Sequence, residues 1–364
     1  MATRKNQFIP SIVFHPGRTL AEKLEEMGMG VKEFALRSTK PEKTIIAVIK
    51  GDSSITPDMA VAFESVTRIP AHFWMNEQRS YDEFIAHEKR AAFITESIYW
   101  ANLFPLADMI RKGWLPACKK AEEKVASLFT FFGVSSPKAW EDYYLNQQLK
   151  VAFRISLAGT KEAYAISAWL REGELQTALQ QPKTIFSDKK LRELLPAMKS
   201  LMATQPEGFF QSLQKLCAEA GIKLLYIPQL PKAPISGATR WINETPLIQL
   251  TNRYKRNDIF WFSFFHEIGH ILLHGKKDIF LEDIEYTDKQ MEKELEADNF
   301  AERMLLTKSE TNEILGLKEY SETAIKFYAK KFNTHPAIIV GKLQHLKVLQ
   351  YWEYKEFIEK IDLN

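Results

Sequence analysis

The 364-residue sequence predicts a mainly α protein with a small β-sheet, of the α+β class. Apolar residues recur at helical spacing along most of the chain, and turn signals divide the first 80 residues into short helices. Short β-rich runs stand close together at residues 222–227, 237–242 and 247–251. We therefore expect four regions: a bundle of short helices at 10–85, a helical linker domain at 86–205, a domain with the sheet at 206–345, and a helical tail at 346–364.

The composition is that of a globular protein, with 45% hydrophobic and 26% charged residues. A net charge of +3 neither requires nor excludes a nucleic-acid partner. Cys118 and Cys217 are the two cysteines, and no secretory signal follows the first residues, which favours a reducing cytoplasm. The most apolar run, 259–273, is shorter than the roughly 20 residues of a membrane span and predicts a buried helix.

In the first region, Thr56 and Pro57 form an N-cap signal, and Gly51 marks the end of the preceding helix. Two short helices are expected at 31–38 and 41–50. Their spacing and amphipathic character suit a helix-turn-helix, whose second helix enters the major groove of DNA. Because short bundles with lysines are common, a protein-interaction module is the alternative.

If this bundle binds DNA, its lysines would neutralise phosphates, and its hydroxyl groups would bond phosphates or base edges. The candidate contacts are Ser38, Thr39, Lys40, Lys43, Thr44 and Lys50.

The region from about 85 to 220 is helical in pattern and rich in aromatic residues, which are placed inside proteins by default. We assign it a packed core and no chemistry.

The chemistry is concentrated in residues 266–270, His-Glu-Ile-Gly-His. Two imidazoles at positions i and i+4 share one helix face, so His266 and His270 can reach one metal ion. Glu267 is offset so that its carboxylate can reach a metal-bound water without becoming a ligand, and it can act as general base. The apolar surroundings argue against an ordinary solvated helix, because burying such groups without a partner is costly. The pattern predicts a zinc site for hydrolysis.

A catalytic zinc usually has three protein ligands. Lys276 occupies the position at which one zincin class has a third histidine, which excludes that class. A later helix offers Glu294 and Glu296, and helical phase favours Glu294, which shares a face with Ala297 and Ala301. Asp298, one turn on, is then expected to orient a ligating histidine, while Glu296 is expected to be solvated.

His274 has three interpretations: it could stabilise the oxyanion, add a ligand, or cap the last carbonyl groups of its helix. His335 and His345 are expected in capping or surface roles. The mechanism indicated is metal-assisted hydrolysis, in which Glu267 takes a proton from water and passes it to the leaving amine.

These residues resemble the ImmA/IrrE metallopeptidase family over about residues 200–345. The resemblance rests on the runs 236–241, 247–250, 260–275 and 294–301. It implies a zincin-like domain with His266, His270 and Glu294 as zinc ligands and Glu267 as base. Members of that family are cytoplasmic bacterial proteins, and some cleave a helix-turn-helix repressor.

The first region resembles the HigA-type antitoxins, a branch of the Cro/repressor-like helix-turn-helix family, over nearly all of residues 10–85. The runs that carry this resemblance are 15–17, 32–35, 41–45, 49–51, 55–57 and 73–74.

The two resemblances together indicate a regulator that binds operator DNA and carries a zinc-dependent endopeptidase for a repressor or antitoxin. The alternative is a non-proteolytic antitoxin or transcriptional repressor whose peptidase-like domain serves as a sensor or partner-binding module. The expected partners are double-stranded DNA, a protein substrate, a toxin and a second copy of the chain, with no membrane.

Overall fold

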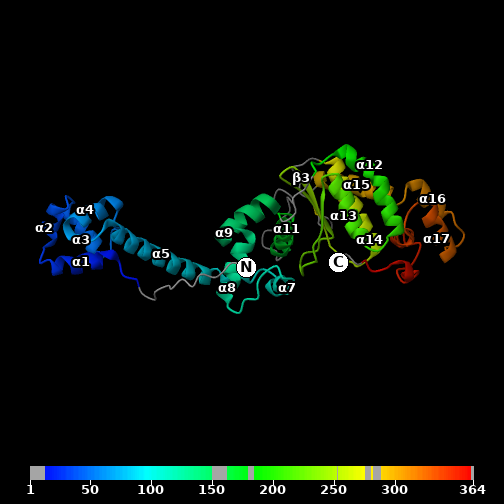
Figure 1. Cartoon of the computed structure of the whole chain (residues 1–364). Coiled ribbons are helices and arrows are strands. Elements are labelled where there is room, and N and C mark those ends of the chain that lie inside the picture. Colours follow the sequence, from blue (N-terminus) through cyan, green and yellow to red (C-terminus); the bar gives the residue numbers. More distant parts are fainter. Residues whose placement is uncertain are drawn as a thin grey trace. The chain divides into compact units, whose positions relative to one another are not determined.

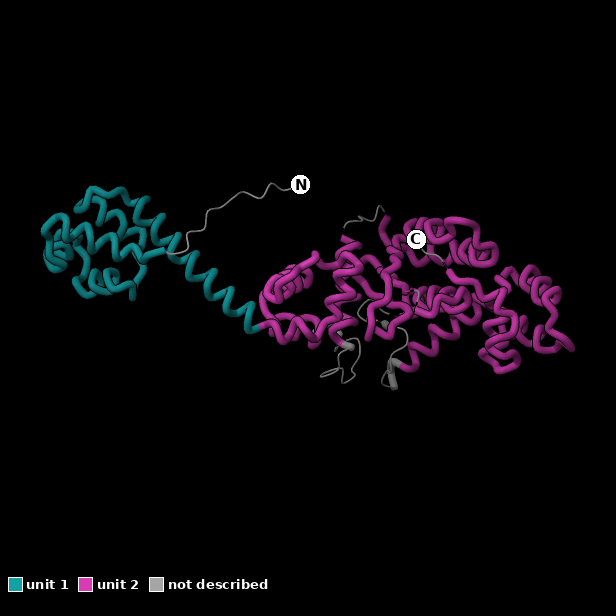
Figure 2. Tube along the Cα trace, turned by 90° about the horizontal axis from the view of Figure 1, so that it is seen from below, with its two compact units in different colours: residues 1–96 teal, residues 97–364 magenta. Residues whose placement is uncertain are grey.

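The computed structural model of the chain is mainly α with one small sheet, as the sequence predicts (Figure 1). It describes residues 13–149, 162–178, 184–251, 253–274, 280–281 and 288–361. The chain divides into two compact units, residues 1–96 and 97–364, which are coloured separately in Figure 2. Helix α5 (Ala71–Glu96) continues past residue 85, so the division between units falls at 96. The further domain boundaries at 205 and 345 stay predictions.

The amino-terminal unit is a bundle of five helices within its described residues: α1 (Pro16–Glu26), α2 (Val31–Arg37), α3 (Glu42–Lys50), α4 (Pro57–Thr67) and α5. Thr56 caps α4 by accepting a hydrogen bond from the Met59 amide at 3.3 Å. Gly51 ends α3 in the left-handed conformation with φ 81°, where glycine has no steric penalty. The structure therefore confirms both capping signals of the sequence.

The core of this unit is built from large apolar side chains that its helices bury together. Ile45 and Val48 of α3 are fully buried, and the Phe63 ring contacts Trp74 edge-to-face at 5.9 Å between centroids. Burial of these side chains supplies the main stabilising free energy of such a small bundle. The helix pair α2–α3 is thereby anchored on α4 and α5.

The carboxy-terminal unit begins with helices, as the aromatic-rich pattern predicts. They are α6 (Ile98–Ala101), α7 (Leu106–Arg111), α8 (Ala121–Phe132), α9 (Pro137–Trp140), the π-helix η1 (Glu141–Leu149), α11 (Glu162–Ala178), α12 (Asp188–Thr204) and α13 (Phe209–Glu219). Aromatic rings fill their core: Trp100 stacks on Phe129, and Trp140 stacks on Tyr164.

The sheet has the strand order β1-β3-β2-β4, with β1 (Lys223–Tyr226), β2 (Gly237–Ile242), β3 (Thr245–Leu250) and β4 (Phe280–Leu281). Strands β1 and β3 are parallel, whereas β2 is antiparallel to both β3 and β4. The sequence predicts the first three strands to within two residues at each end. It misses β4, because two residues are too few to show an alternating pattern.

The remaining elements are α14 (Asn257–Leu273), α15 (Asp288–Leu305), α16 (Lys308–Leu315), α17 (Glu322–Lys331), α18 (Pro336–His345) and the 3₁₀ turn η2 (Lys355–Phe357). Helices α12 to α15 gather beside the sheet, and their buried faces form one hydrophobic core with it (Figure 1). His335 caps α18 by accepting a hydrogen bond from the Ala337 amide at 3.2 Å, as expected.

A buried polar network ties α11 to the sheet. Arg240 of β2 pairs with Glu174 of α11 at 2.7 Å and donates to the Gln249 side chain at 2.8 Å. Gln249 in turn donates to the Trp169 carbonyl at 3.2 Å. Because burying a lone guanidinium is costly, this network holds α11 against β2 and β3. It therefore fixes the strand that flanks the site described below.

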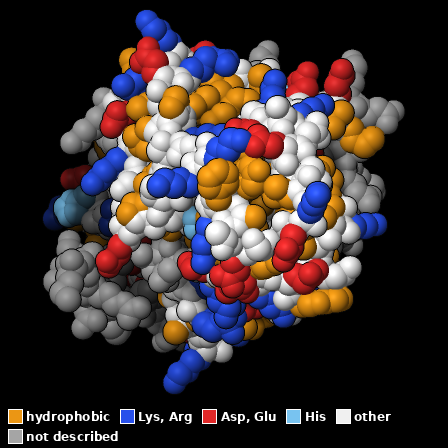
Figure 3. All heavy atoms as spheres, turned by 90° about the vertical axis from the view of Figure 1, so that its right-hand side faces the viewer, with side chains coloured by type: hydrophobic (Ala, Val, Ile, Leu, Met, Phe, Trp, Pro, Cys, Tyr) orange, Lys and Arg blue, Asp and Glu red, His pale blue; other side chains and the backbone are white. Residues whose placement is uncertain are grey.

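Figure 3 shows the face of the molecule around α16 and α17, where Lys and Arg alternate with Asp and Glu around hydrophobic groups. Neither positive nor negative charge dominates this face. Within the described parts of the chain, every helix is too short or too polar to cross a lipid bilayer.

Candidate metal centre

The metal-binding motif lies on α14, a helix that is buried on nearly all sides. Its apolar residues pack into the main core, and His266, Glu267 and His270 are each at most 2% exposed. The sequence predicts this burial from the apolar residues that surround the motif. Three ionisable side chains held in such a place need compensating partners.

The two histidines converge on one point. The Nε2 atoms of His266 and His270 lie 2.9 Å apart on one face of α14, as the i, i+4 spacing predicts. Glu294 Oε2 lies 3.1 Å from His266 Nε2 and 3.5 Å from His270 Nε2. In the parts of the chain that the structure describes, these three residues form the group whose ligand atoms all lie within 4.8 Å of one another.

Helix α15 can deliver Glu294 because it packs tightly on α14. Ala297 and Ala301 are fully buried, as expected for the face that approaches α14. A Cβ added at Gly269 would lie 3.1 Å from the Ala297 Cα and 3.3 Å from the Phe300 Cβ, closer than ordinary contacts. Glycine at 269 therefore lets the two helix backbones approach at the level of the ligands.

The other ring nitrogens of the histidines are held by outer partners. His266 Nδ1 lies 2.8 Å from Asp298 Oδ1, the contact expected from helical phase. His270 Nδ1 lies 2.9 Å from His274 Nδ1, and His274 Nε2 lies 3.0 Å from Glu296 Oε2. Such partners fix the tautomer and orientation of metal-binding imidazoles.

The contacts of His274 and Glu296 go beyond the sequence reasoning. His274 is the C-cap residue of α14, yet its side chain bonds to His270 and Glu296. Glu296 is 56% exposed at its side chain, but it is not merely solvated as expected, because it supports His274. Helical phase could not show this, since His274 lies beyond the last turn of α14. Lys276, the basis for excluding a histidine-ligand class, lies outside the described residues.

Glu267 faces the sheet. Its side chain is fully buried, and a Cβ added at Gly237 of β2 would lie 2.5 Å from Glu267 Oε1. Thr239 of the same strand donates to the Glu267 carbonyl at 3.2 Å. Glycine at 237 therefore leaves room for the Glu267 carboxylate between α14 and β2.

The donor set fits a bound metal. If the Nδ1 atoms of His266 and His270 carry hydrogens for Asp298 and His274, both Nε2 atoms present lone pairs toward Glu294. Glu294 Oε1 is buried and has no hydrogen-bond partner among the described residues. Two imidazole nitrogens and one carboxylate are the protein ligands of many catalytic zinc sites.

The ionisation states also suit a metal. Burial lowers the pKa of His270 to about 4, so its imidazole is neutral at pH 7. Burial alone would raise the pKa of Glu294, but hydrogen bonds and charge from His266 and His270 outweigh it and lower the pKa to about 2. His270 and Glu294 thus need no deprotonation before binding a cation at neutral pH.

Residues 217–341 match the model of the M78 peptidase family, which is described as the IrrE N-terminal-like domain. These residues form an IrrE-like domain. Its sheet, α14 and α15 are the elements that the sequence resemblance placed in this family, and the match includes His266, Glu267, His270 and Glu294.

The chain is also similar to two solved antidote proteins. An antidote protein of a plasmid maintenance system from Nostoc punctiforme is 28% identical; the match covers 21% of this chain and 85% of that one, with a TM-score of 0.21. An addiction module antidote protein of the HigA family from Coxiella burnetii is 31% identical, over 23% of this chain and 91% of that one, with a TM-score of 0.22. Comparison with curated proteins gives no match.

The candidate DNA contacts in the amino-terminal unit differ in their exposure to solvent. Lys43, Lys50 and Thr39 are exposed, and Thr44 is half-buried on α3. Ser38 is buried, and its hydroxyl donates to the Ala35 carbonyl at 3.4 Å, so it does not face solvent as a DNA contact would.

Lys40 forms an ion pair with Asp58 at the start of α4. Its charge is therefore already partly neutralised before any phosphate arrives.

Proposed function

We propose that this chain is a zinc-dependent endopeptidase in which His266, His270 and Glu294 bind zinc. The observation that carries the proposal is the convergence of their three ligand atoms, from α14 and α15, within 4.8 Å of one another. Glu267 follows His266 on the same helix, and its buried carboxylate faces Gly237 of β2. If these three residues bound no metal, the buried Oε1 atom of Glu294 would have no partner among the described residues, which is costly.

The reaction follows from the placement of the chain's own groups. A bound zinc ion supplies Lewis acidity at this point and makes water more acidic. Glu267 takes the proton of the attacking water as the new C–O bond forms at the carbonyl carbon. It then delivers that proton to the amine nitrogen, and the peptide C–N bond breaks. Asp298 and His274 keep the imidazoles oriented.

We further propose that the substrate is a regulatory protein, such as a repressor or antitoxin, and that the amino-terminal unit binds operator DNA. The α2–α3 pair has helix lengths and exposed lysines that suit a major groove. An attached DNA-binding unit would raise the local concentration of the peptidase near a DNA-bound substrate. A toxin and a second copy of this chain are proposed as further partners.

The peptidase proposal is tested by comparing new protein amino termini in cells that express the wild-type chain or Glu267→Gln. Gln keeps the size of the side chain but cannot accept a proton as a base. We expect termini that appear only with the wild type, while both proteins bind about one zinc per chain. Identical sets of termini from two zinc-loaded proteins would contradict the proposal.

The DNA-binding proposal is tested with Lys43→Ala on a duplex DNA probe at rising salt concentration. Loss of one phosphate contact should reduce the slope of log affinity against log salt by about 1. Lys89→Ala, which removes an exposed lysine from α5, is the matched control and should leave the slope unchanged. Equal slopes for all three proteins would remove Lys43 from the interface.

A further inference from the structure

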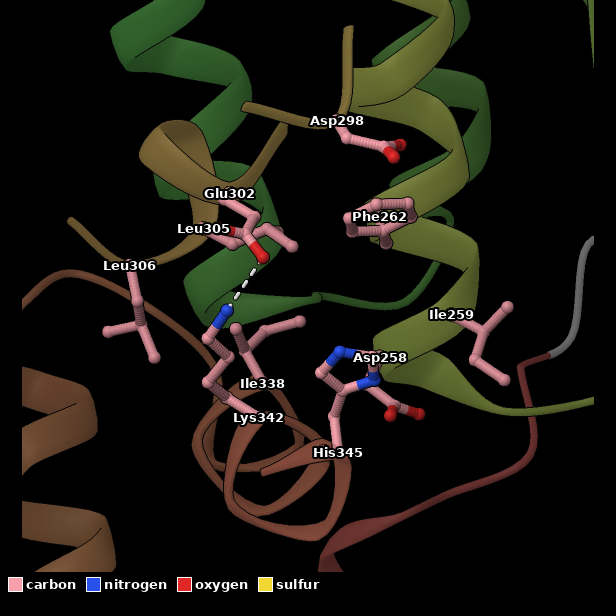
Figure 4. A pocket seen from close by; sticks show the side chains of 11 residues that line it. Asp258, Ile259, Phe262, Asp298, Glu302, Leu305, Leu306, Ile338, Lys342 and His345 are labelled. Carbon is pink, nitrogen blue, oxygen red and sulfur yellow. Dashed lines mark hydrogen bonds and ion pairs between the residues drawn. The ribbon is translucent and has the colours of Figure 1, made fainter. Parts of the chain in front are cut away.

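A cavity of ≈ 310 Å³ lies between α14, α15 and α18 of the carboxy-terminal unit (Figure 4). Apolar side chains form most of its wall: Ile259 and Phe262 from α14, Leu305 from α15, and Ile338 from α18. Its volume is at the lower end of the range for small-molecule sites, which are mostly apolar with a few placed polar groups. The proposed peptidase mechanism makes no use of this cavity.

Most charged groups at the cavity are neutralised by neighbours. Lys342 pairs with Glu302 at 2.7 Å, as Figure 4 shows, and Arg256 bonds both carboxylate oxygens of Asp258 at 3.0 and 2.8 Å. These pairs leave little net charge for a ligand to meet.

Asp298 differs from these carboxylates. It lines the same cavity, and the partner that the described residues give it is His266 Nδ1 at 2.8 Å. A neutral His266 donates to Asp298 through Nδ1 without supplying a positive charge, and no Lys or Arg among the described residues forms an ion pair with Asp298, whose side chain is 47% exposed. The cavity therefore combines apolar side chains with two paired carboxylates, His345 and the unpaired charge of Asp298. This lining favours a ligand that has an apolar body and one positive charge.

We propose that this cavity binds a small primary amine with an aromatic or branched aliphatic body. The ammonium group would lie against Asp298, and the body would pack between Phe262, Ile259 and Ile338. The Phe262 ring already lies 6.1 Å from the His266 ring between centroids, so the ligand would sit directly behind a metal-binding histidine.

This position couples the amine site to the metal centre. An ammonium at Asp298 draws electron density from the carboxylate and weakens it as an acceptor for His266 Nδ1–H. His266 then becomes a less basic ligand, so the amine lowers metal affinity. By thermodynamic reciprocity, metal lowers amine affinity by the same factor. The effect should stay below the roughly 10–100-fold loss that accompanies removal of such an outer partner.

Calorimetric titration of the full chain tests the site, with 2-phenylethylamine as the probe and 3-phenylpropionate as an anion of similar body. We expect saturable binding of one amine per chain, with a dissociation constant of roughly 10 µM to 1 mM for so small a ligand. The anion should show no saturable binding. The amine should bind up to about tenfold more tightly to chelator-treated protein than to zinc-loaded protein.

Two variants locate the binding. Ile259 is half-buried, so Ile259→Trp should narrow the cavity without unfolding the helix, and amine affinity should fall at least about tenfold. Phe327→Trp adds an indole at an exposed position on α17 and should bind the amine like the wild type. Melting temperatures of both variants verify that they fold.

The proposal is overturned if the amine shows no saturable binding, if the anion binds equally well, or if a folded Ile259→Trp binds as tightly as the wild type. Because binding is also measured in Glu267→Gln, it does not depend on cleavage. Failure of the amine site and failure of the peptidase proposal are therefore distinguishable.

Discussion

Replacing Asp298 by Asn should weaken zinc binding by a predictable amount. Asp298 accepts a hydrogen bond from His266 Nδ1 at 2.8 Å, a distance typical of a charge-assisted bond. Hydrogen bonds to charged groups contribute about 1.5–3 kcal/mol. That range corresponds to roughly 10–150-fold in a binding constant, in agreement with the 10–100-fold effect of such outer partners on metal affinity. Because Asn keeps a neutral acceptor, we expect a loss near tenfold.

The assay is a competition titration in which the full chain and a fluorescent chelator share a limiting amount of zinc. Asp298→Ala should lose more affinity than Asp298→Asn, since it removes the acceptor altogether. Glu292→Gln, an exposed carboxylate on α15, is the matched control and should bind like the wild type. The reasoning is refuted if both Asp298 variants bind zinc within twofold of the wild type.

Three further predictions follow from the same geometry. His274→Ala should lower zinc affinity about tenfold because His270 Nδ1 loses its partner, and Glu296→Gln should have a smaller effect. If His274→Ala binds zinc as tightly as the wild type in the competition titration, His274 does not support His270. Gly269→Val should lower the free energy of unfolding by about 1–3 kcal/mol through crowding against α15, and an unchanged urea midpoint would contradict that close packing. The pKa of His270 is about 4 in the folded chain and about 6.5 in the unfolded chain, so the unfolded chain binds more protons between these pH values. The free energy of unfolding, measured by urea unfolding with chelator present, should therefore fall as the pH decreases from about 6.5 to 4. A flat pH profile would argue against a buried neutral His270.

The parts of the fold that were predictable are those with strong local signals. Thr56 and Gly51 mark helix ends through capping chemistry, and the i, i+4 spacing of His266 and His270 determines a shared face whatever the tertiary structure. Asp298 could be placed for the same reason, because its position follows from one turn of helix after Glu294.

The parts that were not predictable depend on contacts between distant segments. The bond between His274 and Glu296 joins the end of α14 to the outer side of α15, and helical phase within either element does not determine it. Ser38 was a plausible DNA contact by residue type, yet the turn after α2 buries it. Strand β4 is two residues long and exists only through pairing with β2. The amine cavity likewise arises from three helices that are separate in sequence.

The most direct test of the metal centre is anomalous diffraction at the zinc absorption edge from crystals of the zinc-loaded chain. The account predicts one strong peak per chain, bounded by His266 Nε2, His270 Nε2 and the Glu294 carboxylate. Crystals of His270→Ala should lose that peak. A peak at another place, or no peak at full zinc loading, would contradict the central claim.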